Sequence, residues 1–313
     1  MTYLYSRTHQ YTFKEPHCEP PRNCQLGSTC EDAPLLNFRE MRNRLKSLAR
    51  QILPHGICEY SFRRHDYVRM GLRPSQALWR SFSAQQYDSV CDARLNLLPV
   101  EITGSLRTCV DAGANVGNWT ETLVTLFRPE RVIAVECDPR LVGNLKARLG
   151  PFENVQVVDA ALADGEGEAT FHQLRQAAGS SLLKPQREIG REFAPSSWDV
   201  VGEVRVRKMS YDRLVEQEEE ISILKMDIQG AEMAVLRNSR KGLERTKSVI
   251  VEVLFTSHYE NDSGFAEIHQ LMAQKGFGLY RLTSPYDRGG RALFADAIYG
   301  REDILKELAP AGI

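Results

Sequence analysis

The feature that most constrains the fold is the stretch VDAGANVG at residues 110–117, together with the residues on either side of it. The mostly apolar run before it predicts a buried strand that ends at Asp111, and residues 118–127 carry apolar side chains at helical spacing. A strand, a glycine turn and a helix open a nucleotide-binding α/β unit. Glycines let the backbone approach a ligand closely, and the start of the helix offers N–H groups to it.

The rest of the chain from about residue 99 repeats this alternation of strands and helices. We expect strands at 107–111, 131–136, 155–159, 221–227, 248–254, 278–282 and 292–299, and helices at 119–127, 140–149, 231–237 and 265–275. This pattern predicts a doubly wound α/β fold with a mostly parallel seven-stranded sheet. The last two strands are joined by a Pro/Gly loop without a helix, so they are expected to form an antiparallel hairpin at the sheet edge.

One long insertion interrupts the alternation between residues 159 and 221. Within it, residues 168–172 and 203–208 alternate like strands, and residues 211–219 have a helical pattern. The middle, residues 173–197, is irregular and contains Gly179-Ser180-Ser181. Because long irregular excursions at the carboxyl edge of a sheet are more often functional than structural, we expect this one to border a binding site.

The sequence before the main domain contains no recognisable binding motif. Residues 1–33 lack any period and are expected to form a poorly ordered arm, residues 34–98 are expected to form a small helical cap, and residues 99–313 the main domain. Cys18, Cys24 and Cys30 lie too far apart in sequence for a standard zinc knuckle. Cys109 and Cys137 fall in strand-like runs and are expected to be reduced core residues.

Composition argues against several classes of partner. The chain has 40 basic and 41 acidic side chains and a formal net charge of −1, so it lacks the electrostatic footprint of a nucleic-acid-binding protein. No apolar run is long enough to span a bilayer, and the first ten residues lack the apolar core of a signal peptide. We therefore expect a cytoplasmic protein with no nucleic-acid partner and no membrane span; the oligomeric state stays open.

The glycine turn narrows the choice of ligand. A dinucleotide fingerprint needs a second glycine where this chain has Asn115, and a phosphate loop needs Gly-Lys where Asn118 follows Gly117. A ligand with a ribose and an amino-acid chain but no phosphate fits what remains, and S-adenosylmethionine is such a ligand. Glu136 ends the second strand nineteen residues after Gly117, where a carboxylate can accept ribose hydroxyls. Asp159-Ala160 falls where the adenine ring is expected.

A second marker is the stretch LKMDIQGAE at residues 224–232. Asp227 ends the fourth strand, across the switch point of the sheet from the glycine turn. Lys225 lies on the same side of the strand as Asp227 because side chains alternate with a period of two. Glu232 begins the next helix, where a carboxylate interacts favourably with the helix dipole.

At this point the sequence resembles FkbM-type methyltransferases. The resemblance rests on VDAGANVG, Glu136 with Asp138-Pro139, the GSSLL stretch at 179–183 and KMDIQGAE, and it covers about residues 90–301. It implies the class I methyltransferase fold and methylation of a hydroxyl, often on a sugar or a natural product. It also implies that Asp111 to Gly117 and Glu136 hold the donor and that Asp227 stands beside its methyl group. In all, the residues expected to contact the donor are Asp111, Gly113, Ala114, Asn115, Gly117, Asn118, Glu136, Cys137, Asp159, Ala160 and Asp227.

The expected reaction is transfer of a methyl group to the oxygen of a small-molecule or glycan acceptor, which needs a base to remove a proton. Asp227 is the first candidate for that base, with Lys225 beside it and with Glu252 and His258, a residue of exposed-loop character, as the others. A divalent ion between Asp227 and Glu252 is conceivable, but no metal site is assigned. Two alternatives stay open: methylation of nitrogen on a small molecule or protein, and a binding module without catalysis.

Overall fold

The computed structural model describes residues 100–103, 105–186, 198–283 and 285–308. The expected N-terminal arm and helical cap (residues 1–98) and part of the irregular insertion (187–197) lie outside these residues. Among the described helices, none is long and apolar enough to cross a bilayer.

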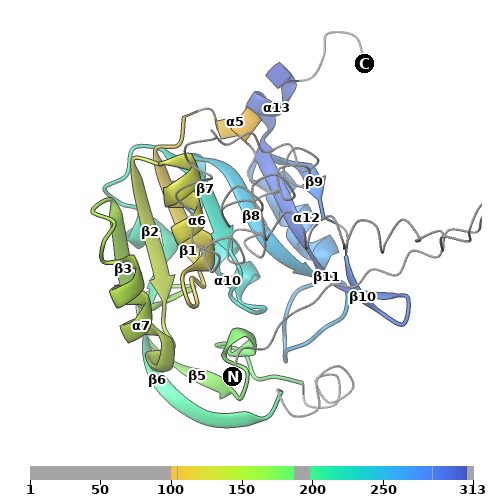
Figure 1. Cartoon of the computed structure of the whole chain (residues 1–313). Helices are drawn as coiled ribbons and strands as arrows, with labels where there is room; N and C mark the ends of the chain where they lie inside the picture. Colours follow the sequence, from red (N-terminus) through yellow and green to blue (C-terminus); the bar gives the residue numbers. More distant parts are fainter. Residues whose placement is uncertain (1–99, 104, 187–197, 284, 309–313) are drawn as a thin grey trace, which may run out of the picture. The chain divides into compact units, whose positions relative to one another are not determined.

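The centre of the fold is a mixed sheet in which the strand order is β10-β11-β8-β7-β1-β2-β3, with β9 also paired to β11 (Figure 1). Its five inner and left-hand strands in that view are mutually parallel: β1 (Thr108–Ala112), β2 (Arg131–Glu136), β3 (Val155–Asp159), β7 (Ile221–Met226) and β8 (Thr246–Leu254). The last three strands are antiparallel to their neighbours: β9 (Phe277–Leu282), β10 (Tyr286–Arg288) and β11 (Arg291–Arg301).

This topology confirms the predicted class I methyltransferase-like fold, with two differences. The main sheet has 8 strands, not seven, because β10 forms within the expected Pro/Gly loop and pairs with β11. The insertion builds a separate 3-stranded sheet in the order β4-β6-β5, from β4 (Ala161–Ala163), β5 (Gly167–Leu174) and β6 (Val200–Ser210).

The helices cover the two faces of the main sheet. They are α5 (Val100–Thr103), α6 (Asn118–Phe127), α7 (Pro139–Leu149), α9 (Tyr211–Leu214), α10 (Glu232–Asn238), α11 (Arg240–Glu244), α12 (Phe265–Gln274) and α13 (Glu302–Leu308), with the short 3-10 turn η2 (Ala177–Gly179) in the insertion. The helix expected at 211–219 ends at Leu214.

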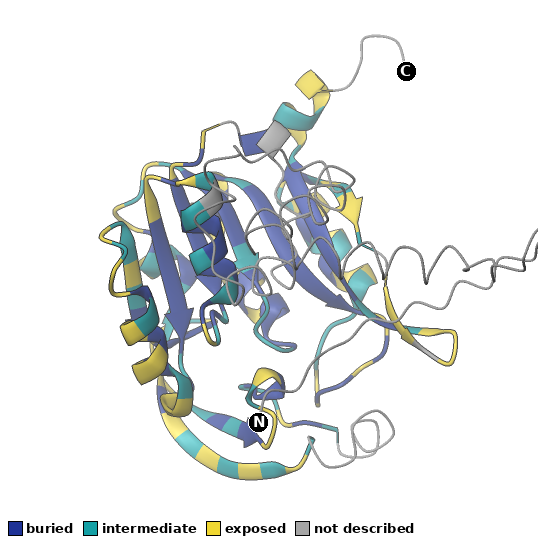
Figure 2. Cartoon of the chain, in the orientation of Figure 1, coloured by how far each residue is buried: buried dark blue, intermediate teal, exposed yellow. Residues whose placement is uncertain are grey.

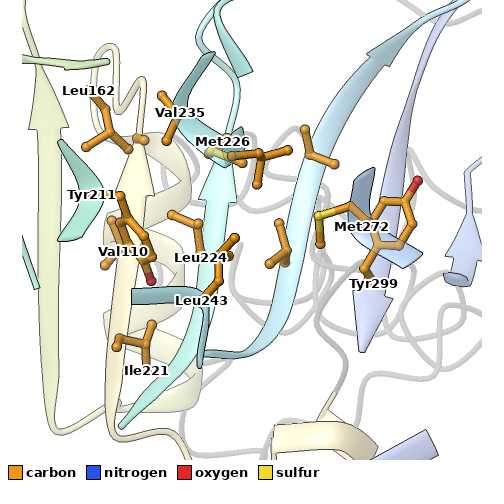
Figure 3. Close-up of a cluster of buried hydrophobic side chains, with 14 of the residues drawn as sticks. Val110, Leu162, Tyr211, Ile221, Leu224, Met226, Val235, Leu243, Met272 and Tyr299 are labelled. Carbon is orange, nitrogen blue, oxygen red and sulfur yellow. The ribbon is translucent and has the colours of Figure 1, made fainter. Parts of the chain in front are cut away.

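The sheet is buried on both faces (Figure 2) because successive side chains of a strand point to opposite faces and the inner strands carry apolar residues at successive positions. In β1, Val110 packs in one cluster with residues of α10, α11 and α12, such as Val235, Leu243 and Met272 (Figure 3). Cys109, the neighbouring residue of β1, packs on the opposite face with Trp119 of α6. Apolar side chains on both faces of the inner strands remove a large apolar area from water, which is the main driving force for this part of the fold.

Candidate active site

The glycine turn lies between β1 and α6 and has a backbone that only certain residues allow. Gly113 and Gly117 have positive φ angles of 77° and 86°, and Asn115 between them has a φ of 53°. A Cβ on Gly113 would lie 2.0 Å from the carbonyl oxygen of Asp227, and one on Gly117 would lie 2.8 Å from Cδ1 of Leu145. Both glycines are therefore required by conformation and by close packing, the first against the end of β7.

Asp111 lies beneath this turn and does not line the cavity described below. It is fully buried, its Oδ2 accepts a hydrogen bond of 2.7 Å from the Thr120 hydroxyl, and its Oδ1 lies 3.0 Å from Nζ of Lys225. The same ammonium lies 3.5 Å from the carbonyl oxygen of Gly113. Lys225 thus ties β7 to the end of β1 and to the glycine turn.

Glu136 is held by backbone amides at the end of β2. Its Oε2 accepts the Asn115 N–H, and its Oε1 accepts the N–H groups of Cys137 and Asp138, each at 2.8 Å. Burial raises the pKa of Glu136, and these three hydrogen bonds oppose the rise. A carboxylate has about four acceptor positions, so this arrangement leaves room for about one further donor at Glu136.

A cavity opens at the carboxyl ends of β1, β2 and β7. It holds about 540 Å³ of space not filled by protein atoms, part of it open to solvent. Its polar side is formed by Gly113, Asn115, Glu136, Asp227 and Gln229, and its apolar side by Val135, Leu141, Ala161, Leu162, Phe171 and Leu182. Among the described lining residues there is no Lys, Arg or His, whereas two carboxylates are present.

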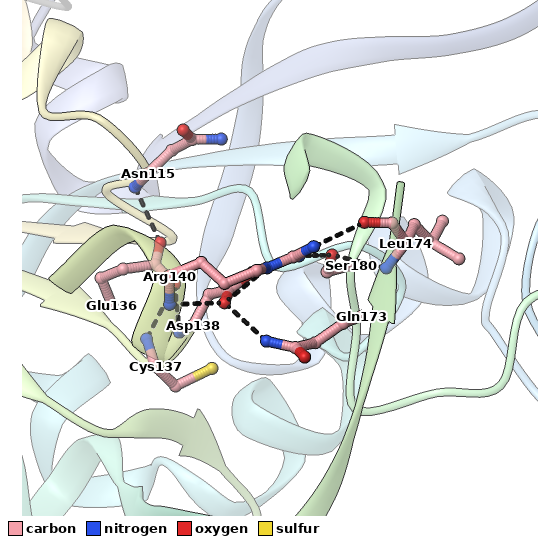
Figure 4. Close-up of polar contacts among 8 residues, drawn as sticks. All are labelled: Asn115, Glu136, Cys137, Asp138, Arg140, Gln173, Leu174 and Ser180. Carbon is pink, nitrogen blue, oxygen red and sulfur yellow. Dashed lines mark hydrogen bonds and ion pairs between the residues drawn. The ribbon is translucent and has the colours of Figure 1, made fainter. Parts of the chain in front are cut away.

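An ion pair between the buried Asp138 and the partly exposed Arg140 fixes the wall that the insertion contributes (Figure 4). Asp138 caps α7 by accepting the Arg140 N–H at 3.0 Å, and it also accepts a 2.9 Å hydrogen bond from Nε2 of Gln173 in β5. The guanidinium of Arg140 contacts Asp138 and donates to the Leu174 carbonyl at 2.9 Å and to Oγ of Ser180 at 3.0 Å. Although burial opposes it, hydrogen bonding to Arg140 and Gln173 lowers the pKa of Asp138. Arg140 therefore connects the end of β2 to η2, which borders the cavity.

The carboxylates of Asp227 and Glu252 meet through one amide. Nε2 of Gln229 donates to Oδ1 of Asp227 at 2.6 Å and to Oε2 of Glu252 at 3.1 Å. The Tyr259 hydroxyl lies 2.8 Å from Oε1 of Gln229 and 2.8 Å from the carbonyl of Gly179. The position between the two carboxylates, where a divalent ion was conceivable from the sequence, is bridged by an amide.

The remaining predicted residues divide between the cavity and its surroundings. Cys137 and Ala160 line the cavity, and Ala114, Gly117 and Asn118 do not. Oδ1 of Asn118 accepts a hydrogen bond of 2.7 Å from Arg148. The unpaired thiol of Cys137 is half-buried, and burial raises its pKa, whereas Cys109, also unpaired, is in the core as expected.

Asp159 and His258 lie away from the cavity lining. The Asp159 side chain is 56% exposed and pairs with Lys146 at 3.4 Å. His258 is buried, with 8% exposure, so the expectation of an exposed loop residue was wrong. The loop folds back because Asp262 accepts the N–H groups of His258 and Tyr259 at 2.7 and 2.8 Å. Burial lowers the pKa of the His258 imidazole.

Several residues of the site were not predicted as site residues. Phe171, Ser180, Leu182 and Gln229 line the cavity, and Arg140 and Tyr259 hold its walls. The sequence carried a partial signal for two of these regions: Asp138-Pro139 has the form of a helix N-cap followed by proline, and the Gly-Ser-Ser motif marks the wall formed by η2. The partners of Tyr259, and those of Arg140 in the insertion, are distant in sequence and had no local signal.

Comparison with known proteins decides the family. The model of the methyltransferase FkbM domain matches residues 111–279, more than half of the chain. The chain belongs to this family. It is accordingly a methyltransferase, and the matched range begins at Asp111 and includes the glycine turn, Glu136, Asp227 and Tyr259.

Two curated methyltransferases are similar to this FkbM-family chain. The 2-O-methyltransferase NoeI of Sinorhizobium fredii is 22% identical over 187 residues, covering 58% of this chain and 74% of NoeI. Methyltransferase sdnD of Sordaria araneosa is 25% identical over 197 residues, covering 55% of this chain and 74% of sdnD. Among solved structures, a methyltransferase FkbM from Methylobacillus flagellatus is similar with a TM-score of 0.39 and 14% identity, covering 77% of this chain and 60% of that one.

Proposed function

We propose that the protein uses S-adenosylmethionine to methylate a hydroxyl oxygen on a sugar, glycolipid or natural-product acceptor. The observation that carries the proposal is the charge of the cavity, whose described lining has two carboxylates, Glu136 and Asp227, and no cationic side chain. Phosphate-bearing cofactors are bound by cationic side chains and glycine-rich phosphate loops. A cationic donor without phosphate suits this acidic lining better than a phosphate-bearing cofactor does.

The cavity also matches such a donor in polarity. One side of it is polar, at Gly113, Asn115 and Glu136, and the other side is apolar, at Phe171 and Leu182. A ribose hydroxyl would donate to Glu136, an aromatic ring would pack on the apolar side against Phe171 and Leu182, and the amino-acid end would lie by Gly113 and Asn115. With Glu136 as described, one ribose hydroxyl fits at once, and a second needs Glu136 to release a backbone amide.

The protein's own contribution to the reaction is alignment and proton removal. When bound, S-adenosylmethionine supplies a methyl group already activated for transfer. Asp227 directly follows β7 and lines the cavity, and this position supports our assignment of it as the base that accepts the proton of an acceptor hydroxyl. Glu252 stands behind it through Gln229. Similarity to NoeI, whose name describes a 2-O-methyltransferase, favours oxygen over nitrogen as the acceptor atom.

Two measurements test the proposal in sequence. Isothermal titration calorimetry with S-adenosylmethionine tests donor binding, and a screen with methyl-labelled donor against sugars, glycolipids, hydroxylated natural products and amines tests transfer. Transfer to amines alone would replace the O-methyl assignment with the N-methyl alternative. Donor binding with no transfer to any acceptor would favour a binding module.

Asp227→Asn tests the assigned base directly. The amide cannot take up a proton, so we expect turnover to fall by about 10²–10⁴-fold while donor affinity changes by less than about tenfold. Asp303→Asn, on an exposed carboxylate of α13 outside the cavity lining, is the matched control and should keep its turnover. Unchanged turnover in Asp227→Asn would refute its role as the base.

A further inference from the structure

We propose that Gln229 is a positioning residue that holds the carboxylate of Asp227, on the cavity wall, in register with the carboxylate of Glu252 behind it. This inference rests on the proposed function and adds a residue to it. Its basis is the set of contacts that fix Gln229 at its amide nitrogen, its amide oxygen and its backbone.

The side-chain amide has one orientation that suits all its neighbours. An amide nitrogen carries two N–H donors, and here they point to Asp227 at 2.6 Å and Glu252 at 3.1 Å. The amide oxygen lies 2.8 Å from the Tyr259 hydroxyl, which is buried. Turning the amide over would bring its oxygen against two carboxylates, so Tyr259 and the carboxylates together select the orientation shown.

The backbone of Gln229 is bent into a conformation that few residues adopt. Its φ is 59°, and the following Gly230 has a φ of 93°. The Gln229 carbonyl accepts a 2.7 Å hydrogen bond from Oγ of Ser181 in the insertion, and a Cβ on Gly230 would lie 3.0 Å from the Tyr259 ring. A left-handed conformation in a residue other than glycine persists where the surroundings enforce it, and such residues are common at active sites. Here the bend directs the side chain back over the end of β7.

The Gln229 amide, which bridges Asp227 and Glu252, changes the electrostatics of these two carboxylates. Two carboxylates on neighbouring strands disfavour each other's ionised form, whereas hydrogen bonds donated to them favour it. Gln229 donates to both at once without adding charge. The other titratable groups near the pair in the described part of the chain are the carboxyls of Glu232, Asp262 and Asp296, the phenol of Tyr259, and Lys225, whose ammonium lies 3.0 Å from Asp111.

The main test is Gln229→Asn, measured in the full-length protein. Asparagine tolerates a left-handed backbone well, so the fold should be kept, but its amide is one methylene too short to reach both carboxylates. Losing these donors makes the pair easier to protonate. We therefore expect the acid limb of the kcat–pH profile to move up by about one pH unit and kcat at neutral pH to fall by about tenfold, with donor affinity within about threefold.

Two further variants separate this role from a purely structural one. Tyr259→Phe removes the hydroxyl that orients the amide and should shift the same limb in the same direction by a smaller amount. Gln186→Leu is the matched control: its amide donates to Oγ of Ser257 at 2.7 Å and to the Tyr259 carbonyl at 3.0 Å, so it supports the same loop without touching a carboxylate. The acid limb of the kcat–pH profile of Gln186→Leu should not move. The inference is overturned if the acid limb of Gln229→Asn stays where it is in the wild type, or if Gln186→Leu shifts it equally.

A readout without an acceptor keeps the two proposals distinguishable. Carbon-13 NMR titration of the Asp227 and Glu252 carboxyls can be done on the donor-free protein. If the wild-type protein transfers methyl to no acceptor, the proposed function fails, and the titration still tests the bridge. Carboxyls that take up a proton at higher pH in Gln229→Asn than in the wild type support it, and superimposable titrations refute it.

Discussion

Glu232 offers a stability test that depends on one buried carboxyl. It lies at the start of α10, is 2% exposed, and its Oε1 accepts the Ile228 N–H at 2.9 Å. Burial raises its pKa from 4.5 to about 7, the negative charge of Asp227 adds to the rise, and backbone hydrogen bonds from residues including Ile228 and Gly230 oppose it. The folded protein therefore binds a proton at Glu232 more tightly than the unfolded chain does.

The sign and size of the effect follow from this difference. Because the pKa is higher in the folded state, the stabilising contribution is complete below about pH 4.5 and is lost as pH rises through about 7. At about 1.36 kcal/mol for each unit of pKa, the full effect is about 3 kcal/mol, of which about 2.5 kcal/mol falls between pH 5 and pH 8. Glu232→Gln stays neutral throughout and should lack this dependence.

Urea unfolding of wild type and Glu232→Gln at pH 5 and pH 8 measures the effect. The amide loses one acceptor oxygen, so the variant carries a pH-independent cost of about 1–2 kcal/mol, which cancels when the two pH values are compared. Relative to wild type, we expect the variant to gain about 2.5 kcal/mol in its free energy of unfolding between pH 5 and pH 8. A gain below about 0.5 kcal/mol would refute the assignment of a raised pKa to Glu232.

Two other substitutions test the ends of the cavity. Glu136→Gln should weaken S-adenosylmethionine binding by about 10–100-fold in calorimetry, since hydrogen bonds to charged groups contribute about 1.5–3 kcal/mol; an unchanged affinity would remove Glu136 from the donor site. Arg140→Met keeps the apolar stem of the side chain but loses the bonds to Asp138 and Ser180. Because the Arg140 side chain is 33% exposed, we expect the free energy of unfolding to fall by only about 1–3 kcal/mol. Donor affinity should also fall, by about fivefold or more, if the Ser180 wall contacts the donor.

Elements with a strong local pattern were predicted closely. The bounds of β2 and β3 match the prediction at both ends, because short runs rich in valine and isoleucine between polar residues suit a buried parallel strand. The helix expected at 140–149 starts one residue earlier, at Pro139, because Asp138 caps it and proline suits the first helical position. In contrast, β10 has three residues and depends on pairing with β11, so its own sequence held little information.

The site was predictable in outline but not in its contacts. Glu136 and Asp227 follow strands of a parallel sheet, so sequence order alone places them at one edge. The partner of Asp111, in contrast, cannot be read from sequence order, because it is the register of β1 against β7 that sets Asp111 opposite Lys225. That register depends on packing of the whole sheet, and no spacing along the chain reveals it. The contact between Tyr259 and Gln229 is of the same long-range kind.

These contacts join the two sequence markers into one structural unit. The Asp227 N–H donates to the Ala112 carbonyl at 3.1 Å, and Gly113 packs so tightly on the Asp227 carbonyl that a Cβ would lie 2.0 Å from it. Lys225 spans the same junction through Asp111. Any side chain at Gly113 must therefore displace the backbone of Asp227 as well as the turn. Under the proposed function, donor binding and placement of the base depend on one junction between β1 and β7, and neither can be altered there alone.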